Sequence, residues 1–111
     1  MVNLNMQTND ITVEFLFFEG CPLAPKALLH LEQAIAQLKG QMKIAINHVD
    51  LMHPSTPDSL KRWGSPTILL NGHDISGAKP GEANNCRIYS SPGGVLSAQE
   101  IAEALIRESS L

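Results

Sequence analysis

The sequence lacks the features that mark several large classes of protein. It has two cysteines in 111 residues, too few for the disulfide scaffold of a small secreted domain. Eight Lys and Arg against eleven Asp and Glu give a net charge of −3. No basic stripe is present, which argues against a nucleic-acid partner. No apolar run approaches the roughly 20 residues that a membrane-spanning helix needs, so we expect no membrane partner.

Signals for targeting and for several kinds of catalysis are also missing. The first ten residues, MVNLNMQTND, have no basic start followed by an apolar block, so they do not resemble an export signal. We expect a cytoplasmic protein with reduced thiols. There are no paired carboxylates, no serine triad and no phosphate-binding loop. The four histidines show no ligand spacing with each other or with the cysteines, so we predict neither a metal site nor a cofactor.

The chain length and the pattern of apolar residues both indicate one domain. Residues 1–10 are polar and predict a loose arm, and residues 11–111 predict a single domain. Residues 11–18 read as a strand that is apolar on both faces near its end, which is typical of a central strand. Residues 26–40 have helical apolar spacing and end in a glycine. Residues 43–51 read as a second strand, so the intervening helix predicts a parallel crossover.

The second half predicts a hairpin and a final helix. Residues 54–64 predict a connector of one or two helical turns. Asn71-Gly72 is a strong hairpin signal between strands 67–70 and 73–76. A long loop, 77–94, leads to a helix over 96–109. In that helix Ser97 and Glu100 form a capping box, and Leu96 can pack against Ile101.

This order predicts an α/β fold: β-α-β, a short helix, then β-β-α, with a four-stranded mixed sheet and helices on both faces. It is typical of a minimal thioredoxin-like sheet. Strands one and two would then end at the edge where strand three begins, which places Cys21 and Pro66 at that edge.

Two motifs carry a resemblance to a known family. The strand ending in Glu-Gly-Cys-Pro before a helix resembles the redox loop of thioredoxin and glutaredoxin relatives, and GSPTILLNGHDISG resembles the second half of that fold. With the late CRIY, these residues resemble small bacterial thioredoxin-like proteins of uncertain activity that have a single cysteine in the redox loop, over residues 11 to 108. The resemblance implies a nucleophilic Cys21 followed by Pro22, beside a cis Ser65-Pro66 bond.

The sequence departs from the redox motif at Ala24, which stands where the family has its second, resolving cysteine. The resemblance therefore implies a monothiol arrangement, in which Cys86 or an external thiol resolves a mixed disulfide. GAKPGEANN replaces the glycine-rich acidic stretch of glutaredoxins, which puts glutathione in doubt as a ligand. The partners implied are a protein disulfide or a low-molecular-weight thiol.

The reactivity of Cys21 depends on where the following helix begins. If Pro22 is the first helical residue, Cys21 caps the helix, where free N–H groups favour thiolate. If the helix begins at Pro25 with Ala24 as its cap, this effect is weaker. In either case the negative charge of Glu19 opposes formation of the Cys21 thiolate. We predict that the sulfur faces solvent; the alternative is a buried structural cysteine.

The loop from residue 77 leaves at the same edge as Cys21, so Cys86 is a candidate resolving thiol if the Cα atoms come within about 7 Å. Lys79 and Arg87 in that loop are candidates to bind a carboxylate or phosphate. The alternative is a solvated loop in which Cys86 packs into the core. His48 and Asp50 either tune Cys21 or are ordinary residues at a strand end.

Two functions remain open. The first is a thiol-disulfide oxidoreductase with Cys21 as nucleophile and Cys86 or an external thiol as resolver. The second is a non-catalytic binding module that holds a peptide or thiol ligand at the Ser65-Pro66 edge. There, the backbone groups of Ser65 would pair with an extended segment, the 77–94 loop would help to hold it, and Cys21 would be inert. We expect Pro22, Ser65, Pro66 and Arg87 to bind the substrate or ligand.

Overall fold

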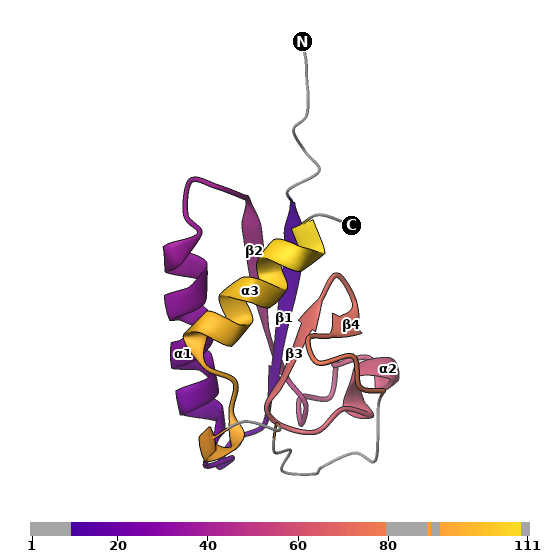
Figure 1. Cartoon of the computed structure of the whole chain (residues 1–111). Coiled ribbons are helices and arrows are strands. Elements are labelled where there is room, and N and C mark those ends of the chain that lie inside the picture. The colour runs from indigo at the N-terminus through magenta and orange to yellow at the C-terminus, as the bar shows by residue number, and fades with distance from the viewer. Residues whose placement is uncertain (1–9, 80–88, 90–91, 110–111) are drawn as a thin grey trace.

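A computed structural model describes residues 10–79, 89 and 92–109. It contains a mixed sheet flanked by helices (Figure 1). The predicted arm is outside the described part of the chain apart from Asp10, so the division at residue 10 stays a prediction. In chain order the elements are β1 (Ile11–Phe17), α1 (Ala24–Gln37), β2 (Ile44–Asp50), α2 (Asp58–Lys61), β3 (Thr67–Leu70), β4 (His73–Asp74), a 3₁₀ turn (Pro92–Gly94) and α3 (Ala98–Ser109).

The four strands lie in the order β2-β1-β3-β4. β1 pairs in parallel with β2 and antiparallel with β3, and β4 pairs antiparallel with β3. The predicted α/β fold with a four-stranded mixed sheet is therefore confirmed, and β1 is the expected central strand. The C-terminal ends of β1 and β2 meet the start of β3 at one edge, which is where Cys21 and Pro66 lie.

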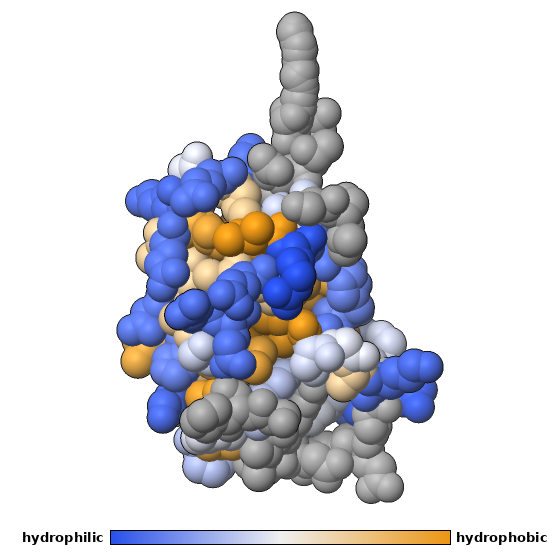
Figure 2. All heavy atoms as spheres, viewed as in Figure 1, coloured by the Kyte–Doolittle hydropathy of each residue, from blue (hydrophilic) through white to orange (hydrophobic). Residues whose placement is uncertain are grey.

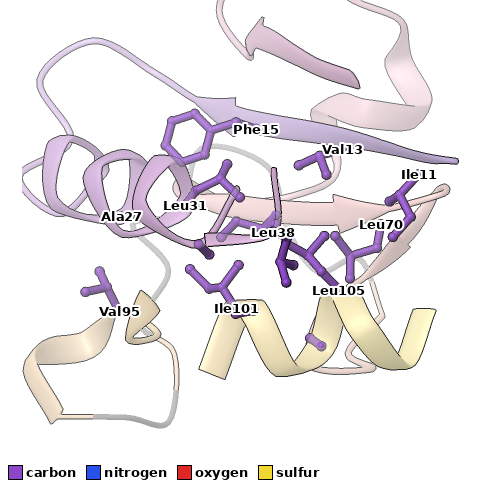
Figure 3. Packing of buried hydrophobic residues seen from close by; sticks show 14 of the residues in the cluster. Ile11, Val13, Phe15, Ala27, Leu31, Leu38, Leu70, Val95, Ile101 and Leu105 are labelled. Atoms are coloured by element: carbon purple, nitrogen blue, oxygen red, sulfur yellow. The ribbon is translucent and has the colours of Figure 1, made fainter. Parts of the chain in front are cut away.

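Alternation along β1 divides the core into two clusters, one on each face of the sheet. Ile11, Val13 and Phe15 are buried in the larger cluster with residues of α1 and α3 (Figure 3). Leu16 points to the other face and packs with Trp63 in the smaller cluster. Leu60 of α2 packs against that smaller cluster. Helices therefore cover both faces, with α1 and α3 together on one of them (Figure 1).

The outer surfaces of α1 and α3 carry mainly hydrophilic residues, with apolar residues visible between the two helices (Figure 2). This is the expected pattern for amphipathic helices that bury one face against a sheet. α3 begins as predicted: the Glu100 N–H donates to Ser97 Oγ at 3.0 Å, and the Ser97 N–H donates to Glu100 Oε1 at 2.9 Å. Among the helices that are described, none is long and apolar enough to cross a bilayer.

The hairpin has the predicted turn but a shorter second strand. Asn71 and Gly72 have φ values of 50° and 94°, the left-handed conformation that this turn requires. β4 ends at Asp74 instead of Ser76. The reason is a local turn: the Asp74 carbonyl accepts from the Gly77 N–H at 2.8 Å, and Asp74 Oδ2 accepts from the Ser76 N–H at 2.8 Å. These bonds turn the chain away from the sheet.

A buried polar network connects this turn to Tyr89. Asp74 is 2% exposed and Tyr89 is 4% exposed. The Tyr89 hydroxyl donates to Asp74 Oδ1 at 3.0 Å and accepts from the N–H of Ile68 at 3.0 Å. The phenol thus bonds β3 on one side and the end of β4 on the other. It ties a residue of the predicted long loop to the sheet.

Candidate functional site

Cys21 lies in the segment that links β1 to α1, at the junction of two turns. Gly20 has a φ of 86°, a conformation in which glycine is favoured because it has no Cβ. The N–H of Cys21 donates to the Phe18 carbonyl at 3.3 Å, and the N–H of Ala24 donates to the Cys21 carbonyl at 3.3 Å. Two successive turns therefore hold the thiol between the end of the central strand and the first helix.

Helix α1 begins at Ala24, with Leu23 in the cap position and no side-chain cap. Neither predicted start, with Cys21 or with Ala24 as cap, is correct. Pro25 is tolerated as the second helical residue because the first N–H groups of a helix have no intrahelical partner. The first bond of the helix runs from the Ala27 N–H to the Leu23 carbonyl, at 3.0 Å. Cys21 lies two residues before the cap.

The sulfur does not face bulk solvent, and that prediction is wrong. Cys21 is 4% exposed and belongs to the larger hydrophobic cluster, beside residues such as Ala24 and Ala27. Its thiol donates to the carbonyl oxygen of Ser65 at 3.5 Å. This contact joins the β1–α1 turn to the segment that begins β3.

The Ser65-Pro66 peptide bond is cis and lies directly beside Cys21. The expectation that its backbone is open to a partner is wrong, because Ser65 is fully buried. The turn after β1 covers Ser65. The Phe18 N–H donates to Ser65 Oγ at 3.3 Å, and the Cys21 thiol donates to the Ser65 carbonyl oxygen. Thr67 Oγ1 also bonds the Gly64 carbonyl at 2.6 Å. Pro22 is exposed, on the outside of the turn.

Cys21 lines a pocket of about 490 Å³ at the C-terminal ends of β1 and β2. Phe15 and Phe17 stack with ring centroids 6.0 Å apart, and the His48 ring meets Phe15 edge-on at 6.4 Å. We call this the Cys21 pocket. The described residues that line it are Phe15, Phe17, Phe18, Glu19, Gly20, Cys21, Ala24, Pro25, Leu28 and His48.

Sequence reasoning identified Cys21, Glu19 and His48 separately but did not identify the pocket. The available signal was strand register. In the parallel pairing, Phe15 is opposite His48, so the aromatic end of β1 and the end of β2 necessarily adjoin. Asp50, which the sequence analysis named together with His48, stabilises the turn after β2. Its Oδ1 accepts a hydrogen bond from the Met52 N–H at 2.9 Å.

The other predicted site residues that the structure describes, Pro22, Ser65 and Pro66, are not among those that line this pocket. Cys86 and Arg87 are outside the described residues, so their proposed roles stay predictions. Lys79 is exposed and lines a different pocket, of about 480 Å³, together with Glu14 and Trp63. Within the described ranges, no group of three His, Cys, Asp or Glu residues is placed to hold a metal ion.

Comparison with known proteins supports the fold. No family model matches the sequence, and no curated protein matches it by sequence. Among solved structures the chain is similar to human ERp44 in its zinc-bound form, a thioredoxin-fold protein, with a TM-score of 0.58 at 18% identity. The similarity covers 93% of this chain but 28% of the ERp44 chain. At this level of identity the similarity shows the fold alone: the chain has a thioredoxin-like α/β fold.

Proposed function

We propose that this protein carries out thiol-disulfide exchange with Cys21 as the nucleophile. The observation that carries the proposal is the position of Sγ. Sγ lies 3.5 Å from the Ser65 carbonyl oxygen, and Cys21 is one of the residues that line a pocket large enough for a small molecule. The thioredoxin-like fold adds support, because the thiol follows the central strand and precedes the first helix.

The reaction begins with loss of the Cys21 proton to solvent. The thiolate attacks one sulfur of a disulfide R–S–S–R, which forms Cys21–S–S–R and releases R–S⁻, and R–S⁻ takes up a proton. An external thiol R′–SH then attacks the R sulfur of the mixed disulfide. Cys21 is restored as a thiol, and the product is R–S–S–R′. The protein returns to its starting state, and the electrons come from R′–SH.

Cys86 is the second candidate resolver. Its attack on the mixed disulfide would form a Cys21–Cys86 bond and release R–SH, and reduction of that bond would then require external thiols. The binding-module alternative is less well supported, because Ser65 is buried and its carbonyl already accepts from Cys21. An extended partner would first have to break that contact.

The proposal is tested with single-cysteine variants, since the chain has two cysteines. Folded Cys86→Ser and Cys21→Ser proteins are treated with 4,4′-dithiodipyridine, and adducts are followed by thiopyridone release and intact mass. We expect a mixed disulfide on Cys21 in the Cys86→Ser protein, which an added thiol reverses. In the wild type, a mass lower by two hydrogens with no adduct would identify Cys86 as the resolver. A stable adduct on Cys21 would exclude Cys86, and its removal by an added thiol would then identify an external resolver. If Cys21 reacts only after unfolding in urea, the proposed function is wrong.

A further inference from the structure

We infer that the Cys21 pocket selects small, uncharged thiols and disulfides with aromatic or branched aliphatic groups, and disfavours anionic ones such as glutathione. This inference rests on the proposed function for the exchange step, but the selectivity of the pocket has its own physical basis. It names a substrate class that the fold by itself does not specify.

The first basis is the shape and composition of the pocket wall. Its volume of about 490 Å³ is within the range of about 300 to 1,000 Å³ that is usual for small-molecule sites. Three phenylalanine rings contribute to the wall, and the aliphatic part comes from the start of α1. Such a wall stabilises a ligand in proportion to the apolar area that it removes from water. Aromatic ligands gain further from ring–ring contacts.

The second basis is charge. Among the described residues that line the pocket, Glu19 is the one with a formal charge at neutral pH, and none is Lys or Arg. A carboxylate that enters an apolar site without a cationic partner loses hydration that nothing replaces. It also meets the Glu19 carboxylate, which repels it. Of the two candidate anion binders from the sequence, Lys79 lines the other pocket and Arg87 is outside the described residues.

A third observation concerns how a ligand reaches the sulfur. Ser65 is fully buried, whereas Cys21, which is 4% exposed, is one of the residues that line the pocket. We therefore expect a disulfide to reach Sγ through the pocket, where the wall can select it. Phe17, Phe18 and Leu28 are only partly buried, which leaves their side chains available for contact with a ligand.

The charge preference is tested with two aromatic disulfides that differ in charge: 4,4′-dithiodipyridine, which is neutral, and 5,5′-dithiobis(2-nitrobenzoate), which carries two carboxylates. Rates are measured on the Cys86→Ser protein, folded and then unfolded in urea, so that the intrinsic reactivity of each reagent cancels. We expect folding to raise the neutral-to-anionic rate ratio by about tenfold or more, which corresponds to about 1.4 kcal/mol. A ratio unchanged by folding would overturn the inference.

A pair of lysine substitutions localises the effect. Leu28 lines the pocket, whereas its neighbour Leu29 is 51% exposed and is not one of the described lining residues. Leu28→Lys should raise the rate with the anionic disulfide several-fold relative to the neutral one, because it places a cation in the wall. Leu29→Lys changes the net charge equally and should leave the ratio as it was. Equal effects of the two substitutions would show that the pocket is not responsible.

Non-covalent binding separates this inference from the proposed function. Cys21→Ser protein is titrated with thioanisole, which cannot exchange, and in parallel with benzoate, while backbone amide shifts are recorded by NMR. We expect thioanisole, but not benzoate, to shift the amide signals of four residues that line the pocket: Phe17, Phe18, Glu19 and Gly20. If neither compound shifts them, the inference is wrong even where Cys21 is reactive. If thioanisole binds but Cys21 is inert in the Cys86→Ser protein, the proposed exchange fails and the preference of the pocket stands.

Discussion

Removal of one oxygen atom, by Tyr89→Phe, should destabilise the protein by about 2 to 4 kcal/mol. The hydroxyl accepts from the Ile68 N–H at 3.0 Å and donates to Asp74 Oδ1 at 3.0 Å, and all three residues are at most 4% exposed. Without it, the Ile68 N–H loses a partner in a place that water does not reach, which costs about 1 to 3 kcal/mol. The carboxyl of Asp74 loses one donor, which adds about 1 kcal/mol or more. Phenylalanine keeps the ring, so packing changes little.

The assay is urea unfolding followed by the fluorescence of Trp63, the single tryptophan, which is 7% exposed in the folded state. With a urea m value of roughly 1 to 3 kcal/mol/M, the loss moves the midpoint by about 0.7 to 4 M. A change below about 0.5 kcal/mol, the usual range for surface substitutions, would refute the assigned role of the hydroxyl.

A double-mutant cycle with Asp74→Ala tests the network itself. Alanine removes both carboxylate oxygens, including Oδ2, which accepts from the Ser76 N–H at 2.8 Å. The single substitution should therefore also be destabilising. Because both changes remove the same Tyr89–Asp74 bond, the double variant should lose less stability than the sum of the two. Simple additivity would mean that the two side chains do not interact.

Three further substitutions test the core, a cap and a turn. Leu31→Ala should cost about 2 to 5 kcal/mol, because Leu31 is fully buried between α1 and the sheet; a cost under 1 kcal/mol by urea unfolding would contradict that packing. Ser97→Ala should cost about 1 kcal/mol and increase hydrogen exchange in the first turn of α3, because the bond to the Glu100 N–H is lost; unchanged exchange would count against the cap. Gly72→Ala should lower the free energy of unfolding by about 1 kcal/mol or more, measured by thermal unfolding. The cause is the φ of 94° alone, since nothing lies within 4 Å of the added Cβ. A neutral result would argue against this turn.

The parts of the fold that the sequence predicted are those determined by local patterns. The Asn71-Gly72 turn and the Ser97–Glu100 capping box depend on neighbouring residues, and both have the expected geometry. The central position of β1 followed from its apolar character on both faces. Helical spacing predicted α1 but not its first residue, because Pro25 is compatible with several positions in a first turn.

The parts that the sequence did not predict depend on contacts between distant segments. Burial of Cys21 arises from packing against helix residues and from a bond to Ser65, 44 residues away. The Asp74–Tyr89 bond spans 15 residues, and neither residue belongs to a motif that marks such a pair. The Cys21 pocket requires the register of β1 against β2, which a periodic pattern of apolar residues does not specify.

The burial of Cys21 restricts how the proposed exchange would proceed. A sulfur in a mixed disulfide has no hydrogen to donate, so each reaction breaks the contact between Cys21 and the Ser65 carbonyl. An S–H group is a weak donor, and its contact at 3.5 Å contributes less than the roughly 1 kcal/mol of an ordinary hydrogen bond. Two stronger features hold the turn without it: the Phe18 N–H bond to Ser65 Oγ and the packing of the turn against α1. The proposed exchange therefore requires the thiol to change its bonding partner while the wall of the pocket stays in place. On that condition one pocket would select both the incoming disulfide and the thiol that resolves it.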